Sequence, residues 1–581
     1  MASVSEVLVE FLAAQQVDEG VPFFGGVFAI FGHGNVAGLG PALGQGTLPV
    51  IRPHNEQGMG MAAVAYAKAH RRRRAFVCTT SIGPGATNLV TPAAVAHVSR
   101  LPVLLLLGEA FADRGPDPVL QQLEHPDDPS RTANDCFRPV ARYFDRIARP
   151  EQLIPSLEQA MGVLTDPVDA GPAVLALPQD VQVEPLEVAP AQLQSRRWPI
   201  RRPRPDAAEL ATAARMVAAS RRPFLVVGGG AVYARAEEPV AAWMNAGVPA
   251  ATTHAGRDAV SSRHPQMLGG LGVTGTEPAN RAVREADLVV IVGSRLTDFT
   301  TGSRALFEDR PRLHVNVNPK DAAKHGAVPL VADAREGLQD LRALGLPPVD
   351  PNWSARWAEA ARAWWQARAE EPRGELLTDG QVLDGVAGWA QPDTTVVAAS
   401  GSIPAEMQKR WRGPAGVGTH VEYGFSAMGY ELAGALGVKL ARPDREVVAL
   451  LGDGAYLMLN GELETAARLG VQLIAVVFDN GGFGCIHRLQ AASQGPSFAN
   501  LIGRRVDLVA HARSLGARAV AAGDGHALRS ALDDAREHAG VSMVVVPTDP
   551  DAGTGSGGAP WRVPGATGPG FAPFGAGEPG S

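Results

Sequence analysis

The chain has 581 residues, of which 45% are hydrophobic and 19% charged, and its formal net charge is −7. A chain of this length exceeds what one hydrophobic core supports, so we expect several ordered domains. The acidic balance gives no general attraction to nucleic acid or to anionic membrane surfaces, which leaves small-molecule chemistry as the expected class of function.

The cysteines and the N-terminal segment indicate a cytoplasmic protein. Cys78, Cys136 and Cys485 are scattered and form no CxxC pair, so neither a disulfide framework nor a cysteine metal site is expected. Residues 1–16 have no basic start and read as an amphipathic helix, and no run of 18 or more apolar residues occurs. We therefore expect no membrane partner.

Short runs rich in Val, Ile and Leu alternate with helical patterns along most of the chain. This alternation is typical of α/β domains whose mostly parallel sheets are covered by helices on both faces. In the first segment, buried strands are predicted at 27–32, 75–80, 102–109 and 172–178. The Pro- and Arg-rich stretch 195–206 suits a linker.

Two further strand sets follow. Strands at 223–230, 287–293 and 312–317 predict a middle domain, and strands at 394–399, 445–454, 471–480 and 541–547 predict a third. We expect three doubly wound domains at 1–190, 206–345 and 370–550. The Gly- and Pro-rich stretch 551–581 is predicted to be a flexible tail.

The βαβ unit between Val447 and Asn480 carries the most informative motif. Gly452, Asp453 and Gly454 close one strand, Asn480 closes the other, and a helix is expected between them at 462–469. Ligands of open α/β sheets bind at this edge, and glycines let backbone approach phosphate oxygens. Asp453, Asn480 and a backbone oxygen of Gly482 would suit octahedral Mg²⁺. Either fragment alone is more often an ordinary strand-to-helix turn.

Together, the two fragments resemble the diphosphate-binding motif of thiamine-diphosphate enzymes. The resemblance implies thiamine diphosphate and Mg²⁺ as cofactors, with cofactor contacts also from Gly401 and Ser402. It assigns Glu56, which opens a helix after Asn55 as its N-cap, to hydrogen bonding with the aminopyrimidine ring. Met428 stands where related enzymes carry the apolar wedge that bends the cofactor.

In this superfamily the activating glutamate and the metal motif meet across a subunit interface. Since Glu56 lies in the first predicted domain and Asp453 in the third, we expect a homodimer or a dimer of dimers with the active site at the subunit interface.

Longer stretches narrow the resemblance. FGHGNVAGLG, NDCFRPVARYFD, MGYELAGALG and DNGGFGCI, with SIGPGATN, resemble the trihydroxycyclohexanedione hydrolases of myo-inositol breakdown over most of the chain. The resemblance implies hydrolytic opening of a cyclic 1,2-diketone, trihydroxycyclohexane-1,2-dione, to 5-deoxy-glucuronate. Proton transfer near neutral pH suits histidine, and His33 and His54 are the candidates, although such histidines are often structural.

Two features depart from that family, and two alternatives stay open. His487 stands where the family usually has Asn, and the terminal segment after Trp561 runs into Gly- and Pro-rich sequence. The same cofactor would also serve a carboligase resembling acetohydroxyacid synthase. A nucleotide-binding regulatory subunit with an inactive thiamine fold is a second alternative. The middle segment GGGAVY lacks the GxGxxG order and carries no secure flavin signature.

Overall fold

The computed structural model describes residues 1–113, 115, 119–123, 125–492, 497–502 and 506–561. The chain divides into two compact units. Unit 1 comprises Met1–Arg201, Leu432–Asp444 and Leu459–Val471, and unit 2 comprises Arg202–Glu431, Arg445–Met458 and Gln472–Ser581. Among the described residues, no helix is both long enough and apolar enough to cross a bilayer.

Unit 1 is built on a six-stranded sheet in the order β5-β4-β6-β7-β9-β8 with all neighbours parallel. Its strands are β4 (Phe24–Ala29), β5 (Val50–Ile51), β6 (Ala75–Thr80), β7 (Val103–Glu109), β8 (Tyr143–Arg146) and β9 (Pro172–Pro178). Every residue of β6, β7 and β9 is buried, which is why these strands read as continuous apolar runs.

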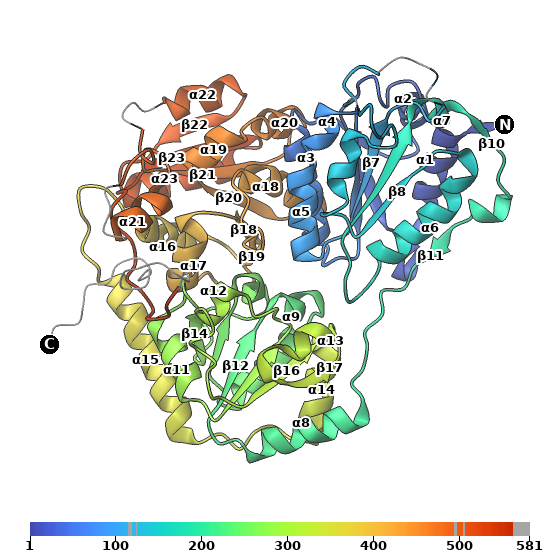
Figure 1. Cartoon of the computed structure of the whole chain (residues 1–581). Coiled ribbons are helices and arrows are strands. Elements are labelled where there is room, and N and C mark those ends of the chain that lie inside the picture. The colour runs from blue at the N-terminus through green and yellow to red at the C-terminus, as the bar shows by residue number, and fades with distance from the viewer. Residues whose placement is uncertain (114, 116–118, 124, 493–496, 503–505, 562–581) are drawn as a thin grey trace. The chain divides into compact units, whose positions relative to one another are not determined.

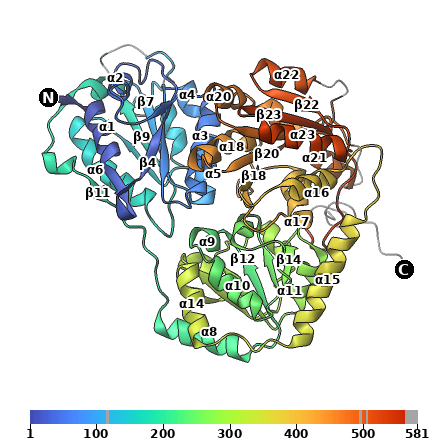
Figure 2. The same cartoon turned by 180° about the vertical axis from the view of Figure 1, so that it is seen from behind.

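Helices cover both faces of this sheet. Figures 1 and 2 show α3 (Glu56–Ala69) and α5 (Val90–Ser99) on one face and α1 (Val4–Ala14) and α6 (Leu153–Leu164) on the other. The amphipathic N-terminal helix is thus confirmed as α1. The remaining α-helices and strands described in unit 1 are α2 (Leu39–Gly44), α4 (Pro84–Thr87), α7 (Gln179–Val183), α20 (Glu462–Arg468), β1 (Ala2–Ser3), β2 (Gln15–Val17), β3 (Val21–Pro22), β10 (Pro185–Leu186) and β11 (Arg196–Arg197). Helix α18 (Tyr430–Ala441) spans the division between the units.

The middle sheet of unit 2 has the order β14-β13-β12-β15-β16-β17 with all neighbours parallel, and the order of its strands reverses between β12 and β15. Its strands are β12 (Pro223–Val227), β13 (Ala250–Thr252), β14 (Met267–Gly270), β15 (Leu288–Val292), β16 (Arg312–Asn316) and β17 (Val328–Val331). Its helices are α8 (Ala207–Ala219), α9 (Gly229–Tyr233), α10 (Glu237–Asn245), α11 (Glu277–Glu285), α12 (Asp298–Thr301), α13 (Pro319–Ala322), α14 (Ala334–Leu344) and α15 (Pro351–Ala369).

Helix α15 lies beyond residue 345, where the sequence suggested that the middle domain ends. Its Trp353, Trp357 and Ala361 belong to the same hydrophobic cluster as Phe224 and Val226 of β12. The helix therefore covers a face of the middle sheet, as Figure 1 shows. The apolar residues of this segment are mainly tryptophans among charged residues, so their helical periodicity is weak. The sequence pattern therefore gives little indication of this helix.

The other sheet of unit 2 has the order β19-β18-β20-β21-β23-β22 with all neighbours parallel. Its strands are β18 (Thr394–Ala398), β19 (Gly418–Val421), β20 (Glu446–Gly452), β21 (Leu473–Asp479), β22 (Arg518–Ala521) and β23 (Val541–Pro547). The helices of this part are α16 (Asp379–Trp389), α17 (Ser402–Arg410), α19 (Asp453–Met458), α21 (Gly484–Ala492), α22 (Leu508–Ser514) and α23 (Gly525–Glu537). Counted along the chain, these strands are arranged in the same order as those of unit 1.

Residues 551–561 form no helix or strand but pack against other segments of unit 2, which differs from the flexible tail expected there. Thr554 is 3% exposed; its N–H donates to Glu406, and its carbonyl oxygen accepts from Lys409 Nζ at 2.7 Å. The carbonyl oxygen of Gly557 accepts from Asn280 at 2.8 Å. Glycine content predicts backbone freedom but not hydrogen bonds from other segments. Residues 562–581 of the predicted tail lie outside the described residues.

Candidate functional site

Three adjacent strands of unit 2 deliver the predicted cofactor residues to one sheet edge. Gly401 follows β18, Asp453 follows β20 and Asn480 follows β21, and β18, β20 and β21 are neighbours in the sheet. The strand order reverses between β18 and β20, and such a reversal opens a crevice at the carboxyl ends. The parallel arrangement predicted from the βαβ pattern is confirmed.

The start of α19 lies directly beside the turn that follows β21. A β-carbon at Gly454 would lie 3.3 Å from the carbonyl oxygen of Gly482 and 2.6 Å from the ring of Phe483. The turn is fixed by backbone bonds, because Phe483 N–H donates to Asn500 O and Ile502 N–H donates to Gly481 O, each at 2.8 Å. The structure thus brings Gly454 and Gly482 together.

The side chain of Asn480 fits the role of a metal ligand. It is 5% exposed, and its Oδ1 atom accepts no hydrogen bond from any residue that the structure describes. A buried amide oxygen without a donor is costly and calls for another partner. Asp453, at the start of α19, is 3% exposed and supplies a carboxylate. Two hard oxygen donors beside a nearby carbonyl suit Mg²⁺.

Gly401 and Ser402 form the start of α17. Gly401 has a φ of +78°, and a β-carbon there would meet no atom within 4 Å, as is also true of Gly452. The hydroxyl of Ser402 donates to Asp379 Oδ2 at 2.6 Å, and Arg488 Nη2 donates to the same oxygen at 3.2 Å. The turn therefore has open space beside Gly401, while the hydroxyl of Ser402 is used by a buried carboxylate.

Met428 is half-buried in a turn before α18. The carboxylate of Glu422, 2% exposed, fixes this turn from within, because Phe425 N–H donates to Oε1 at 2.9 Å and Ala427 N–H donates to Oε2 at 3.2 Å. Ser426 adopts a φ of +56°, a conformation that costs a non-glycine residue energy. The turn is thus held in one shape.

In unit 1, Glu56 opens α3 as expected. Asn55 is its N-cap, with Oδ1 accepting from Gln57 N–H at 2.7 Å, which confirms the predicted cap. Glu56 is half-buried, and its Oε2 accepts from Asn88 Nδ2 at 2.9 Å. A β-carbon at Gly85 would lie 3.2 Å from Glu56 Oε1. Sequence reasoning missed Asn88, although SIGPGATN, which contains it, carried the family resemblance.

His54 and the backbone beside it contact two glutamates of α20. The ring Nε2 of His54 pairs with the carboxylate of Glu464, and this contact lowers the pKa of Glu464. The N–H groups of His54 and Asn55 donate to Glu462 Oε1 at 3.3 and 3.2 Å. Burial raises the pKa of Glu462. The predicted helix at 462–469 therefore supports the turn that presents Glu56.

His33 lies exposed in the turn after β4. The buried side chain of Asn35 shapes that turn: its Oδ1 accepts from Gly32 N–H at 2.9 Å and its Nδ2 donates to Thr79 Oγ1 at 3.2 Å. Gly34 N–H donates to Ser81 Oγ at 3.2 Å. A rigid turn with an exposed imidazole remains compatible with proton transfer at His33, which stays a prediction.

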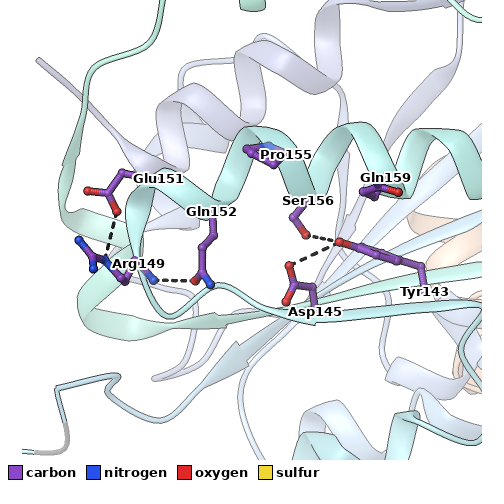
Figure 3. Close-up of a pocket in the computed structure, with 8 residues that line it drawn as sticks. All are labelled: Tyr143, Asp145, Arg149, Glu151, Gln152, Pro155, Ser156 and Gln159. Carbon is purple, nitrogen blue, oxygen red and sulfur yellow. Dashed lines mark hydrogen bonds and ion pairs between the residues drawn. The ribbon is translucent and has the colours of Figure 1, made fainter.

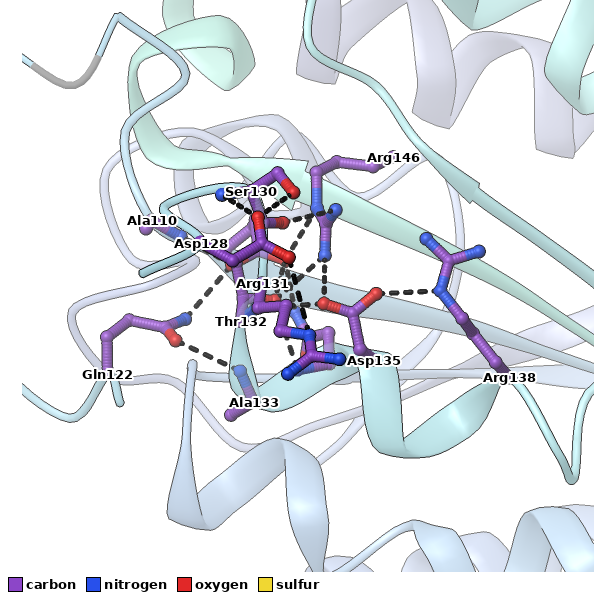
Figure 4. A network of polar contacts seen from close by, with 12 residues as sticks. Ala110, Gln122, Asp128, Ser130, Arg131, Thr132, Ala133, Asp135, Arg138 and Arg146 are labelled. Carbon is purple, nitrogen blue, oxygen red and sulfur yellow. Dashed lines mark hydrogen bonds and ion pairs between the residues drawn. The ribbon is translucent and has the colours of Figure 1, made fainter. Parts of the chain in front are cut away.

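A buried carboxylate fixes the segment after β7. Glu109, 1% exposed, accepts from Arg146 Nε at 3.1 Å, Thr132 Oγ1 at 2.8 Å and Gln122 Nε2 at 3.0 Å. Figure 4 shows Thr132, Asp135 and Arg146 converging in this network. The bonds from Gln122 and Thr132 hold two internal points of the connection between β7 and β8 against the end of β7.

One surface cleft of unit 1 contains none of the predicted site residues. It has a volume of about 540 Å³ and lies between β8 and the start of α6, as Figure 3 shows. Within it, Tyr143 Oη lies 2.9 Å from Ser156 Oγ and donates to Asp145 Oδ2 at 3.4 Å. Tyr143 and Asp145 of β8 therefore bond each other and Ser156 of α6 within the cleft.

His487, which departs from the family pattern, contacts residues on both sides of its ring. Its Nδ1 lies 2.6 Å from Ser497 Oγ and its Nε2 lies 2.7 Å from Asp551 Oδ1. The imidazole therefore joins α21, which follows the proposed metal turn, to the packed segment that starts at residue 551.

Three parts of the chain match domains of thiamine pyrophosphate (thiamine diphosphate) enzymes. Residues 2–128 match the N-terminal binding domain, residues 210–341 the central domain and residues 390–546 the C-terminal binding domain. The matched segments contain both the Glu56 turn and the Asp453 and Asn480 turns.

Curated relatives extend the match over nearly the whole chain. A protein of Geobacillus thermodenitrificans named 3D-(3,5/4)-trihydroxycyclohexane-1,2-dione hydrolase is 41% identical over 535 residues, which are 87% of this chain and 84% of that protein. One of Bacillus cereus, named 3D-(3,5/4)-trihydroxycyclohexane-1,2-dione hydrolase 1, is 38% identical over 97% of this chain and 95% of its own length. The chain therefore belongs to the 3D-(3,5/4)-trihydroxycyclohexane-1,2-dione hydrolase family of thiamine pyrophosphate enzymes.

Proposed function

We propose that this protein uses thiamine diphosphate and Mg²⁺ to open the ring of trihydroxycyclohexane-1,2-dione with water, giving 5-deoxy-glucuronate in myo-inositol catabolism. The observation that carries the proposal is the carboxyl edge of β18, β20 and β21. The turns that contain Gly401, Gly454, Asn480 and Gly482 follow these three neighbouring strands, and the buried amide oxygen of Asn480 accepts no hydrogen bond within the described part of the chain. The substrate in this proposal is the one given in the names of the relatives.

Each predicted residue has a task in this proposal. Asp453, Asn480 and the carbonyl of Gly482 hold Mg²⁺, while the backbone at Gly401, Ser402 and Gly452 receives the diphosphate. Glu56 would accept the hydrogen bond from the aminopyrimidine ring that supports its proton chemistry, and Met428 would supply an apolar contact to the cofactor. When bound, thiamine diphosphate supplies a nucleophilic carbon and an electron sink for cleavage beside a carbonyl.

Proton transfer to and from the cyclic diketone falls to a histidine. His33 and His54 are the proposed groups, since imidazole changes charge near neutral pH. His33 is exposed beside a rigid turn, whereas His54 is already paired with Glu464. Replacing each by Ala should lower turnover without lowering cofactor affinity, and an unchanged turnover removes that residue from the proposal.

The experiment incubates the full chain, thiamine diphosphate and Mg²⁺ with trihydroxycyclohexane-1,2-dione and identifies the product by mass spectrometry. A ring-opened product that gains one water supports the proposal. A parallel incubation with pyruvate tests the carboligase alternative, because acetolactate without ring opening would assign the site to that reaction. Chelating the metal should abolish ring opening, and adding Mg²⁺ back should restore it.

We also propose that the active enzyme is a homodimer or a dimer of dimers whose active site lies at the subunit interface. The support is that Glu56 belongs to unit 1 and Asp453 and Asn480 belong to unit 2, together with the family resemblance. An active monomer in size-exclusion chromatography with light scattering would contradict this assembly.

A further inference from the structure

Glu431 is a buried carboxylate that the predicted mechanism does not use. It stands in the first turn of α18 and is 1% exposed. Its two oxygens accept hydrogen bonds from two different turns: Ser400 N–H donates to Oε1 and Gly429 N–H donates to Oε2, each at 3.1 Å. A buried charge needs such partners, so both bonds matter to the local fold.

Both of these turns adjoin residues that the proposed function assigns to the cofactor. Ser400 directly precedes Gly401, and Gly429 directly follows Met428. Gly401 and Gly429 have φ angles of +78° and +86°, so each turn has a backbone shape that most side chains disfavour. One carboxylate therefore links the turn proposed to receive the diphosphate with the turn that carries the proposed wedge.

Glu422 and Glu431 differ in which turns donate hydrogen bonds to their carboxylates. Glu422 is equally buried and also accepts two backbone N–H groups, but both donors, Phe425 and Ala427, lie in the single turn that follows it. Glu422 thus shapes the Met428 turn, whereas Glu431 ties that turn to a different strand connection.

We infer that Glu431 is a positioning residue whose carboxylate sets the spacing between the Gly401 turn and the Met428 turn, and thereby the affinity for thiamine diphosphate. The inference rests on the proposed function, which assigns both turns to the cofactor. An apolar side chain of similar size would fill the same volume without holding either N–H group, so packing alone does not explain a glutamate here.

Protonation should weaken this tie. Burial raises the pKa of Glu431 to about 7, and the nearby charge of Glu422 acts in the same direction. Tyr430 is a further titratable group beside it, and the Tyr430 hydroxyl lies 2.7 Å from Nε2 of His420. A carboxylate accepts on both oxygens, while a neutral carboxyl accepts well on only one. The link is therefore expected to loosen as the pH falls through 7.

The test measures binding of thiamine diphosphate to the full chain by calorimetry with saturating Mg²⁺ at pH 8 and pH 6. The variants are Glu431→Gln and, as a matched control, Glu446→Gln. Glu446 begins β20, at the opposite end of the strand from Gly452, and bonds Arg536 at 2.7 Å. At pH 8, Glu431→Gln should bind roughly 10- to 100-fold more weakly than the parent, the effect of losing one hydrogen bond to a charged group.

The pH comparison separates positioning from general structure. The parent should lose affinity between pH 8 and pH 6 by more than Glu431→Gln does, and Glu446→Gln should follow the parent. Binding of Glu431→Gln within twofold of the parent at pH 8 overturns the inference. A parent that binds no thiamine diphosphate at all instead rejects the proposed function, on which the inference rests.

A second measurement needs no variant. In the parent chain, amide hydrogen exchange should show protected N–H groups at Ser400 and Gly429 at pH 8, with protection falling toward pH 6. Exchange of both amides at the rate of exposed backbone would overturn the inference even if Glu431→Gln did not fold.

Discussion

Asn480 differs from the other buried asparagines of unit 2 in its side-chain oxygen. The Oδ1 atoms of Asn280, Asn316 and Asn318 accept backbone N–H groups at 2.9, 3.0 and 2.9 Å. Asn480 Oδ1 is equally buried but accepts from no residue that the structure describes. Local turns satisfy the first three, whereas Asn480 has an oxygen available for a cation.

Glu56 allows a direct test of the proposed proton chemistry. Glu56→Gln keeps the size of the side chain and a bond with Asn88 but cannot carry the negative charge. Turnover should fall by roughly 10²- to 10⁴-fold, the usual range for loss of an acid–base group. Affinity for thiamine diphosphate should change little, as measured by calorimetry. Glu151→Gln, with a side chain 69% exposed in the same unit, should leave both quantities unchanged. Full turnover in Glu56→Gln would contradict the assignment.

The connection from β21 to α21 behaves as one preformed element. Gly481 and Gly482 have φ angles of +79° and +148°, and the segment at 500–502 closes over them through backbone bonds. Residues that adopt such angles are nearly always glycine, which explains the Asp-Asn-Gly-Gly sequence. The shape of this turn, rather than any one side chain, brings the carbonyl of Gly482 beside Gly454.

Gly482→Ala tests this element. A β-carbon at Gly482 would lie 2.1 Å from the carbonyl oxygen of Asn500, so the turn must move. We expect Mg²⁺-dependent binding of thiamine diphosphate to weaken by at least about tenfold, or ~1.4 kcal/mol, by calorimetry. Gly523→Ala is the control, because a β-carbon there meets no atom within 4 Å. Equal cofactor affinity in the two variants would show that the turn does not form the metal site.

In the molecule as a whole, two sheets of identical strand order carry complementary halves of the proposed chemistry. Unit 1 presents Glu56 after β5, and unit 2 presents Asp453 and Asn480 after β20 and β21. The middle sheet carries none of the predicted site residues. Under the proposed function, one cofactor would need both sheets, and the proposed assembly would obtain them from two subunits.

Mixing two inactive variants tests that assembly. Glu56→Gln and Asp453→Asn should each lose ring opening. If the site lies between subunits, mixed dimers contain one site with neither change, so co-refolded or co-expressed variants should recover about a quarter of parent activity by subunit statistics. Tagged pull-down would verify that mixed dimers form. Mixed dimers without any activity would place both residues of each site in the same subunit.

Stability of the whole chain should fall on mild acidification because some histidines are buried in neutral form. Burial lowers the pKa of His314, in β16, from 6.5 to about 4. The imidazole of His314 therefore binds a proton more readily in the unfolded chain than in the folded chain. Its contribution to the free energy of unfolding is complete above pH 6.5 and is lost as the pH falls toward 4, by on the order of 3 kcal/mol. Urea midpoints for the parent and His314→Gln should show a flatter pH dependence in the variant. Identical slopes would exclude His314 as a cause.

Much of this architecture follows from residue patterns. The runs at β6, β9 and β23 coincide with their predicted bounds because fully buried parallel strands need an unbroken apolar segment. The meeting of the Asp453 and Asn480 turns also follows, since parallel strands align their carboxyl ends. The short edge strands β19 and β22 were missed because four residues leave little periodicity.

Other features depend on the folded chain. Three contacts join segments that are distant in sequence: the bond from Ser400 to Glu431, the bond from Asn88 to Glu56, and the packing of residues 551–561. The first and the third involve backbone groups. Every residue except proline has the same backbone N–H and carbonyl groups. The sequence therefore does not show which of these groups will form hydrogen bonds with distant segments. The patterns of strands and helices are local, so they can be predicted from the sequence. The hydrogen bonds and packing contacts named here form only when distant segments pack together in the tertiary structure.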